Sequence, residues 1–261
     1  MNILDTIIVE KKKEVEQKKR SLDISELEKG LYFKRKPISF TNFLSDKNKT
    51  GIIAEFKRKS PSKGIINSSA LVEDVILDYV KFGASAVSVL TDEIFFGGSL
   101  EDLKKARVHD IPVLRKEFIV DEYQILESKA FGADIILLIA ACLTKDEVKE
   151  FAHFAKNIGL NVLLEIHTEN ELEHINDDID VVGINNRDLK TFKVDLEHSI
   201  EMCGKIPSDK YKISESGIDN VKTINYLKQN GFGGFLMGEK FMREKNPGKA
   251  FADFINELQG S

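Results

Sequence analysis

From residue 51 onward, the sequence alternates short apolar segments with longer segments of helical periodicity. Several of the helical segments end at a glycine, where a helix C-cap favours that residue. Strands that alternate with helices form a parallel sheet. Eight strand–helix repeats predict an α/β fold, the (β/α)8 TIM barrel. The expected strands are residues 51–57, 85–90, 112–116, 134–139, 161–166, 180–185, 211–216 and 233–238.

A doubly wound parallel sheet is the alternative architecture for such alternation. That fold usually has fewer strands, and its nucleotide-binding members often carry a GxGxxG motif, which is absent here. A length of 261 residues also suits one α/β barrel. The pattern therefore favours the barrel.

The first 48 residues do not follow the repeat, and we interpret them as an N-terminal helical extension packed on a barrel of residues 49–261, in one structural domain overall. Residues 3–20 have apolar positions at helical spacing and a very basic remaining face, and two short helical pieces follow at 22–30 and 38–44. Acidic residues interrupt the basic run, so we interpret it as a solvated helix face rather than a nucleic-acid arm. The apolar stripe predicts packing across one end of the barrel.

The composition excludes several classes of function. A net charge of −5 disfavours binding to nucleic acid or to an anionic membrane. No apolar run approaches the ~20 residues of a membrane span, and the first residues lack the apolar core of a signal peptide. Cys142 and Cys203 show no metal-binding spacing and are expected to be buried free thiols. We therefore expect a soluble, cytoplasmic protein without a metal.

Polar residues concentrate where the expected strands end. In TIM barrels, the carboxyl ends of the strands and the loops after them carry the chemistry. One strand that ends in a charge is common by chance, whereas five of eight strands that do so in phase indicate an active site. The candidate catalytic residues at these ends are Glu55, Lys57, Lys116, Glu165, Asn185 and Glu215.

These residue types suit acid–base chemistry. Lysines and carboxylates that share a water-poor cavity shift one another's pKa values, which makes acids and bases usable near neutral pH. No histidine occupies a predicted strand end. His167 comes closest, two residues after Glu165, and we assign it to the loop or to the start of the next helix. A histidine-based relay and a zinc site are not expected.

The last two repeats predict an anion site. Ser216 and Gly217 follow the strand at 211–216, and Gly238 ends the strand at 233–238. Glycines there allow backbone N–H groups to approach an anion, and barrels frequently bind phosphate after their seventh and eighth strands. Ser60, in the hydroxyl-rich loop SPSKG after the first strand, is a further candidate.

The motifs AEFKRKSPSKG, LRKEFIVDEYQI, LLEIHTENEL, GINNRDLKTF, SESGI and FLMGEKFM resemble, in order and along the whole chain, the indole-3-glycerol-phosphate synthase family. The resemblance implies conversion of 1-(2-carboxyphenylamino)-1-deoxyribulose 5-phosphate to indole-3-glycerol phosphate, CO₂ and water, by a carboxy-lyase of tryptophan biosynthesis. It also implies that no cofactor or metal takes part. Two positions depart slightly from the family pattern: Glu117 replaces an aspartate, and Glu239 stands where some members carry serine.

The resemblance also implies roles. Lys116 matches the general acid that protonates the substrate carbonyl, and Glu165 the carboxylate that faces the aryl nitrogen. Glu55 and Lys57 match the pair that positions the substrate and takes part in dehydration. Asn185 and Glu215 match residues that hold the substrate hydroxyls and the polar network. Matches to anion contacts, and candidates for an apolar slot that seats the benzene ring, are Ser60, Arg187, Ser216, Gly217, Gly238, Leu90, Phe96, Phe118, Leu137 and Leu189.

Two other functions stay open at this point. A phosphoribosylanthranilate isomerase would share the phosphate site, but it would place a cysteine and an aspartate at strand ends. An inactive barrel used as a binding subunit should have lost at least one of Glu55, Lys57, Lys116 and Glu165, and all four are present. The expected partner is a small anionic substrate. We expect a monomer that could associate with other enzymes of the tryptophan pathway.

Overall fold

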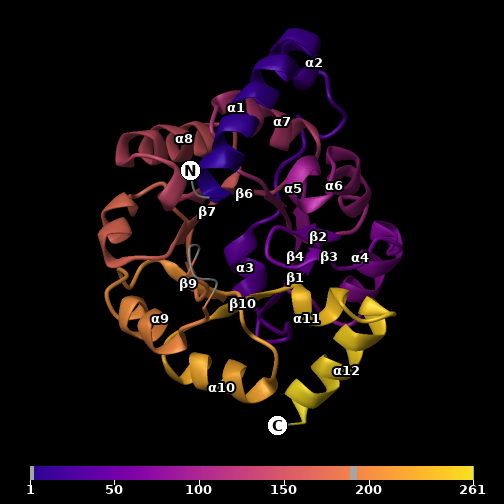
Figure 1. Ribbon diagram of the computed structural model, residues 1–261, viewed down its shortest axis with the longest axis vertical. Helices are drawn as coiled ribbons and strands as arrows, with labels where there is room; N and C mark the ends of the chain where they lie inside the picture. Colours follow the sequence, from indigo (N-terminus) through magenta and orange to yellow (C-terminus); the bar gives the residue numbers. More distant parts are fainter. Residues whose placement is uncertain (1–2, 189–192, 261) are drawn as a thin grey trace.

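The computed structural model describes residues 3–188 and 193–260. Its centre is a closed barrel of eight parallel strands, in which the last strand pairs with the first. Figure 1 shows the helices as a ring around these strands. The predicted TIM barrel is confirmed, and each expected range contains one strand of the barrel. These strands are β1 (Ile52–Phe56), β4 (Ala86–Leu90), β5 (Val113–Lys116), β6 (Ile135–Ile139), β7 (Asn161–Ile166), β8 (Val181–Asn185), β9 (Tyr211–Glu215) and β10 (Gly234–Met237).

The connecting helices follow from local sequence signals. Before α8, Thr144 forms a capping box in which its hydroxyl accepts the N–H of Glu147 and the Glu147 carboxylate accepts the N–H of Thr144. The helices and 3₁₀ turns are α4 (Val72–Lys81), α5 (Glu93–Phe96), α6 (Leu100–Ala106), α7 (Glu122–Ala130), η1 (Ala140–Cys142), α8 (Lys145–Asn157), η2 (Glu169–His174), α9 (Leu196–Cys203), α10 (Val221–Gln229), α11 (Glu239–Met242) and α12 (Pro247–Gln259). A short antiparallel hairpin of β2 (Lys59–Ser60) and β3 (Gly64–Ile65) interrupts the loop after β1.

The interior of the barrel is apolar toward the amino ends of the strands and polar at their carboxyl ends. Side chains alternate along each strand, so that on β1 Ile53 and Glu55 both point inward. The apolar interior cluster is made of Phe40, Leu44, Ile53, Ala86, Leu114, Ile135, Leu137, Ile139, Leu163, Val181, Ile213 and Leu236. Because this cluster fills the rest of the interior, a ligand can enter the barrel only at the carboxyl ends of the strands.

The N-terminal extension reaches both ends of the barrel. Its helices are α1 (Ile3–Ser21), α2 (Ile24–Glu28) and α3 (Phe40–Ser45). Phe40 and Leu44 of α3 complete the interior cluster at the amino ends of the strands, and the Tyr211 hydroxyl donates to the Leu44 carbonyl at 2.9 Å. The buried Val15 of α1 packs with residues of α7, while the first turn of α1 lies at the carboxyl ends. The apolar stripe of α1 thus reaches one end of the barrel, and α3 covers the other. The boundary of the extension at residue 48, within one structural domain, stays a prediction.

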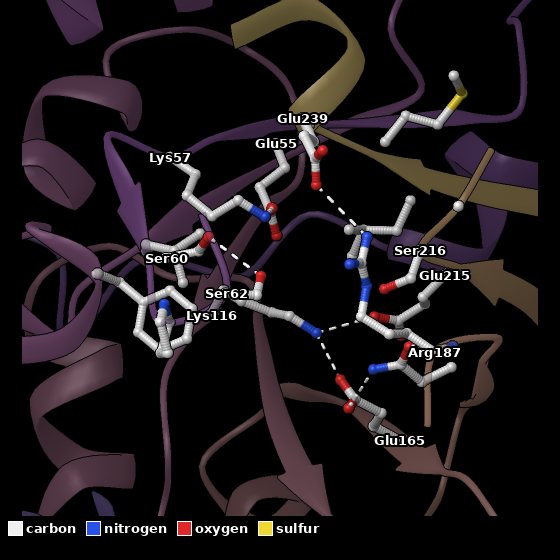
Figure 2. A pocket seen from close by; sticks show the side chains of 18 of the residues that line it. Glu55, Lys57, Ser60, Ser62, Lys116, Glu165, Arg187, Glu215, Ser216 and Glu239 are labelled. Carbon is white, nitrogen blue, oxygen red and sulfur yellow. Dashed lines mark hydrogen bonds and ion pairs between the residues drawn. The ribbon is translucent and has the colours of Figure 1, made fainter. Parts of the chain in front are cut away.

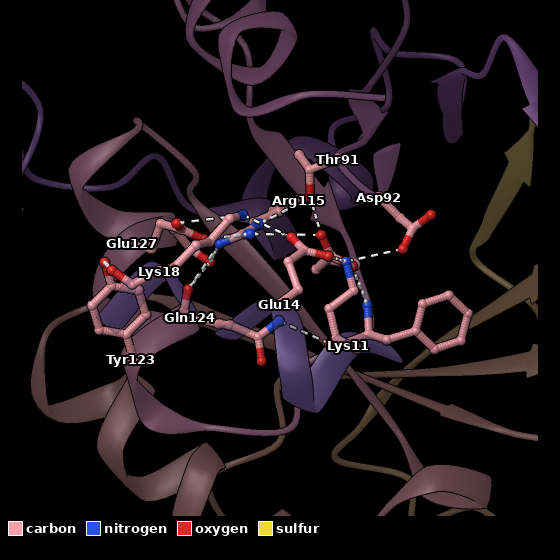
Figure 3. A network of polar contacts seen from close by, with 12 residues as sticks. Lys11, Glu14, Lys18, Thr91, Asp92, Arg115, Tyr123, Gln124 and Glu127 are labelled. Carbon is pink, nitrogen blue, oxygen red and sulfur yellow. Dashed lines mark hydrogen bonds and ion pairs between the residues drawn. The ribbon is translucent and has the colours of Figure 1, made fainter. Parts of the chain in front are cut away.

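The basic face of α1 is not solvated throughout, which corrects the sequence interpretation. The Lys11 side chain is 1% exposed, and its Nζ lies 2.9 Å from Asp92 Oδ2, 3.1 Å from Glu117 Oε1 and 2.7 Å from Glu14 Oε2 (Figure 3). Burial alone would lower the pKa of Lys11, but these carboxylates outweigh it and raise that pKa above its usual value. A lysine in a basic run becomes buried here because the loops after β4 and β5 supply its counter-charges.

The two cysteines are both free thiols: Cys203 is buried, whereas Cys142 is only partly buried, contrary to expectation. None of the helices in the described part of the chain has the length and apolar character needed to cross a membrane.

Candidate active site

A cavity of about 310 Å³ opens at the carboxyl ends of the strands (Figure 2). The structure brings together nearly all of the residues singled out in the sequence, although they come from most of the barrel's loops and strands. The predicted residues that line the cavity are Glu55, Lys57, Ser60, Leu90, Phe96, Lys116, Phe118, Leu137, Glu165, Asn185, Arg187, Glu215, Ser216, Gly217 and Gly238. The last candidate, Leu189, lies outside the described residues.

Lys116 stands at the centre of the charged side of the cavity. Its Nζ donates to Glu165 Oε2 at 2.6 Å and to Glu215 Oε2 at 2.8 Å. Burial acts to lower the pKa of Lys116, but the charges of Glu165, Glu215 and Glu55 outweigh it and hold that pKa above its ordinary value. Lys116 is therefore an ammonium ion that carries a proton into a largely buried site.

The two carboxyl groups that share this ammonium differ in protonation. Burial favours the neutral form of Glu165, but Lys116 and then His167 outweigh it and lower the pKa of Glu165 to about 2. Burial raises the pKa of Glu215 to about 7, with the Glu165 charge adding to the rise against the opposing effect of Lys116. One carboxylate thus stays ionised while its neighbour can hold a proton near neutral pH, as expected for like charges in one site.

Glu55 and Lys57 form a second ion pair across the cavity from Lys116. Lys57 Nζ donates to Glu55 Oε1 at 2.6 Å, as their positions two residues apart predict. Gly238, at the end of β10, faces this pair, since a Cβ at that position would lie 2.8 Å from Glu55 Oε1. The absence of a side chain at Gly238 therefore makes room for Glu55.

Asn185 and Arg187 project from the end of β8 toward opposite sides of the cavity. Asn185 Nδ2 donates to Glu165 Oε1 at 3.0 Å and so helps to fix that carboxylate. The Arg187 guanidinium lies 3.4 Å from the carboxylate of Glu239, at the start of α11. Glu239 also lies 3.7 Å from Lys63 Nζ. Its carboxylate therefore pairs with both Arg187 and Lys63 beside the predicted anion site.

The loop after β9 begins with two residues in the left-handed conformation. Ser216 and Gly217 both have positive φ, 68° and 70°, which is uncommon for a residue other than glycine. Asn186 holds this turn, because its Nδ2 donates to the Ser216 carbonyl at 2.7 Å and to Ser214 Oγ at 3.0 Å. The buried Asn186 is a supporting residue that the sequence motif alone did not single out for this function.

An apolar wall faces the charged groups. Leu90 and Leu137 are buried, and the rings of Phe96 and Phe118 lie 5.9 Å apart between centroids. The first turn of α1 completes this wall with Ile3, Leu4 and Ile7. Sequence analysis predicted an apolar stripe at these positions but not their place in the cavity.

His167 is the residue near the charged groups that sequence reasoning set aside. It does lie in the loop after β7, as predicted, yet its Nε2 is 3.3 Å from Glu165 Oε1. Residues two apart in an extended segment point to the same side, and this spacing was the signal that could have found it. Among the described residues, no group of three or more His, Cys, Asp or Glu is arranged to hold a metal ion.

Comparisons with known proteins agree with this geometry. Residues 4–254 match the family model described as indole-3-glycerol phosphate synthase. The chain belongs to the indole-3-glycerol phosphate synthase family. It is 46% identical to the indole-3-glycerol phosphate synthase of Bacteroides thetaiotaomicron, over 99% of both chains. It is 42% identical to that of Campylobacter fetus, over 98% of this chain and 100% of the other.

Solved structures share the barrel at much lower sequence identity. The tryptophan synthase subunit alpha from Legionella pneumophila superposes with a TM-score of 0.62 at 14% identity, over 85% of this chain and 97% of that chain. At this identity the likeness shows a common fold alone. The indole-3-glycerol phosphate synthase family is therefore supported by the sequence relatives, and the TIM barrel by both comparisons.

Proposed function

We propose that this enzyme closes the indole ring as its family does, converting 1-(2-carboxyphenylamino)-1-deoxyribulose 5-phosphate to indole-3-glycerol phosphate with loss of CO₂ and water. This is a carboxy-lyase reaction of tryptophan biosynthesis. The observation that carries the proposal is a lysine ammonium held between two carboxylates, opposite an apolar wall and beside a glycine-containing turn. Each part matches one feature of the substrate: a ketone, a benzene ring and a phosphate.

In the proposed ring closure, Lys116 donates a proton to the ketone oxygen while a ring carbon attacks the carbonyl. The ionised Glu165, fixed by Asn185, stabilises the positive charge that grows on the aryl nitrogen. Loss of CO₂ then restores the aromatic ring. Glu215, whose pKa of about 7 lets it exist in both forms near neutral pH, keeps Lys116 in place and suits proton exchange with it.

Dehydration requires an acid and a base on the same intermediate. The Glu55–Lys57 pair supplies both at one side of the cavity, 2.6 Å apart. We assign loss of the hydroxyl group to this pair. The phosphate is assigned to Ser216, Gly217, Gly238 and Ser60, with Arg187 close to the substrate carboxylate. The apolar wall of Leu90, Phe96, Phe118 and Leu137 is assigned to the benzene ring, with Leu189 as a further candidate from the sequence.

Incubation of the purified protein with the carboxyphenylamino substrate tests this function. Indole fluorescence should appear in the wild type and be nearly lost in Lys116→Met. An inactive barrel would bind the substrate without producing fluorescence. An isomerase would instead act on a phosphoribosylanthranilate, and no cysteine lines the cavity among the described residues to support that chemistry.

We further propose from the sequence that the enzyme acts in the cytoplasm as a monomer and that it can associate with other enzymes of tryptophan biosynthesis. The free thiols Cys142 and Cys203 are consistent with a reducing compartment. Sedimentation of the purified protein over a range of concentrations tests the monomer, since a dimer would gain mass as the concentration rises.

A further inference from the structure

His167 lies between two carboxylates at the edge of the cavity. Its side chain is 8% exposed, with Nε2 3.3 Å from Glu165 Oε1 and Nδ1 3.8 Å from Glu171 Oε2. Neither ring nitrogen makes a hydrogen bond to any residue that the structure describes. A nearly buried imidazole whose two nitrogens both lack a hydrogen bond is uncommon, which distinguishes it from a histidine held in place by the fold.

Glu171 connects this imidazole to the surface. It belongs to η2, its side chain is 14% exposed, and its Oε2 accepts the backbone N–H groups of His167 at 2.6 Å and of Thr168 at 3.2 Å. These two donors fix the carboxylate at the outer side of the ring. Glu165, His167 and Glu171 therefore form a row from the cavity to solvent.

The proposed reaction requires such a row because it takes up a proton. The substrate carboxylate leaves as CO₂. The ketone oxygen gains two protons and leaves as water, and the CH₂ group between the nitrogen and the former ketone carbon releases one proton. One proton must therefore enter the site in each turnover. Lys116, once it has donated to the ketone oxygen, is a neutral amine that must recover a proton, and Glu165 Oε2 is 2.6 Å from its Nζ.

We propose that His167 is a positioning residue that relays this proton from the Glu171 side to Glu165, an inference that rests on the proposed function. The neutral imidazole first takes up a proton at Nδ1 from a hydronium ion on the solvent side and becomes an imidazolium ion. Its Nε2–H bond then breaks as an O–H bond forms on Glu165, and the neutral Glu165 carboxyl group turns and passes the proton to the Lys116 amine. The imidazole that remains carries its proton on Nδ1, and exchange with solvent returns that proton to Nε2 before the next turnover. Histidine suits this step because its charge changes between pH 5 and 8.

The other groups around His167 do not replace it. Burial raises the pKa of the Cys142 thiol on η1, and the charges of Glu165 and Glu171 raise it further, so this thiol stays neutral. His198 of α9 contacts only the backbone carbonyl of His167, with Nε2 at 3.2 Å. Lys116 lies beyond Glu165 and is the group that receives the proton.

The test compares His167→Gln with the wild type. A glutamine amide can donate a hydrogen bond to Glu165 but cannot carry a proton through the side chain. We expect kcat to fall at least about tenfold, within the range of general acid–base effects, with little change in KM. Added imidazole should restore part of kcat, and more at pH 6 than at pH 8 because the imidazolium ion is the proton donor. If circular dichroism shows that His167→Gln misfolds, His167→Asn is tested in its place.

The matched control is His153→Gln on α8, an exposed histidine whose Nδ1 lies 3.1 Å from Asp178. It should keep wild-type kcat and show no response to imidazole. A His167→Gln enzyme with normal kcat would overturn the relay, and so would a loss that imidazole does not restore. Absence of indole formation by the wild type would instead overturn the proposed function, so the two failures are distinguishable.

Discussion

Arg115 and Lys116 are neighbours on β5, yet they enter two clusters of buried charge with different properties. Strand alternation points Arg115 outward under the helices and Lys116 inward to the cavity. We name the outer group the helix-anchor network; it consists of Lys11, Glu14, Asp92, Arg115, Glu117 and Glu127 (Figure 3). We name the inner group the cavity cluster; it consists of Glu55, Lys57, Lys116, Glu165 and Glu215 (Figure 2).

In the helix-anchor network the central guanidinium is enclosed by protein partners. Arg115 is 1% exposed, and its donors reach Thr91 Oγ1 at 3.0 Å, the Gln124 carbonyl at 3.0 Å, Ser128 Oγ at 3.1 Å and Glu127 Oε2 at 2.6 Å. Glu117 joins Arg115 to Lys11, which ties α1 to the barrel. Four of its five N–H donors make these hydrogen bonds, the guanidinium also lies 3.6 Å from Glu117 Oε2, and Arg115 does not line the cavity, so this buried charge fixes structure.

In the cavity cluster the central ammonium is not saturated. Lys116 has three N–H donors, of which two reach carboxylates of the described residues, and its side chain is 14% exposed to the cavity. Glu215 Oε1 is buried without a hydrogen-bond partner among those residues. The comparison teaches that ion pairs at similar distances serve different ends: the pairs with unused hydrogen-bonding groups facing a cavity are the ones available for chemistry.

Removal of the central cation should separate the two clusters most clearly. Lys116→Met should lower kcat by about 10²–10⁴-fold, since ring closure loses its general acid. The fold should persist, because the apolar interior cluster beneath the site is untouched. Steady-state kinetics and circular dichroism measure both effects. A variant that keeps more than about a tenth of the wild-type kcat would contradict the role of Lys116.

Removal of Lys11 from the helix-anchor network should lower stability and leave kcat unchanged, the reverse of the effect at Lys116. Lys11→Met leaves Asp92 and Glu117 buried without their shared partner, and we expect the free energy of unfolding to fall by about 3–5 kcal/mol. The kcat of the folded molecules should stay close to the wild-type value. Urea denaturation measures the change, with Lys12→Met as the control because Lys12 is the exposed neighbour on the same helix. Equal stability of the two variants would show that the network does not hold α1.

Lys116 and Lys11 also show what could and what could not be predicted from the sequence. The alternation predicted the eight strands because each strand is a short apolar run, and the strand ends predicted Lys116 because the barrel fold carries its chemistry there. Lys11 lies in a basic run on a helix, and nothing local indicates that loops after β4 and β5 will supply its carboxylates. His167 was dismissed for a related reason, since its closeness to Glu165 appears only when the chain continues straight beyond β7.

The buried carboxyl group of Glu215 predicts a pH dependence of stability. Folding raises the pKa of Glu215 from 4.5 to about 7, so its protonated form is the one that the fold favours. Its contribution to stability is fully present below pH 4.5 and is lost as the pH rises toward 7. The stability of the wild type relative to Glu215→Gln should therefore decrease between these pH values and stay level above them. Denaturation of both proteins across this range measures the difference, and a constant difference would contradict the raised pKa.

The smallest expected effect is that of a substitution at Gly238, where the cavity cluster adjoins the predicted anion site. In Gly238→Val, even the Cβ would lie 2.8 Å from both Cβ and Oε1 of Glu55, so Glu55 must move and the backbone approach to a phosphate is crowded. Overpacking of about 1–3 kcal/mol corresponds to a rise in KM of roughly 5- to 150-fold, with a decrease in kcat because the Glu55–Lys57 pair is disturbed.

Gly204→Val is the matched control for this substitution, since a Cβ at Gly204 meets its nearest atom at 3.5 Å, an ordinary contact. Gly204 is the C-cap of α9 and does not line the cavity. Its KM and kcat should be those of the wild type. Inorganic phosphate should compete with the substrate in the wild type and in Gly204→Val, and only weakly in Gly238→Val. If Gly238→Val keeps a normal KM and normal competition by phosphate, the anion does not bind beside Gly238. The assignment of ring closure to Lys116 and Glu165 would stand, because the three atoms nearest to a Cβ at Gly238 all belong to Glu55.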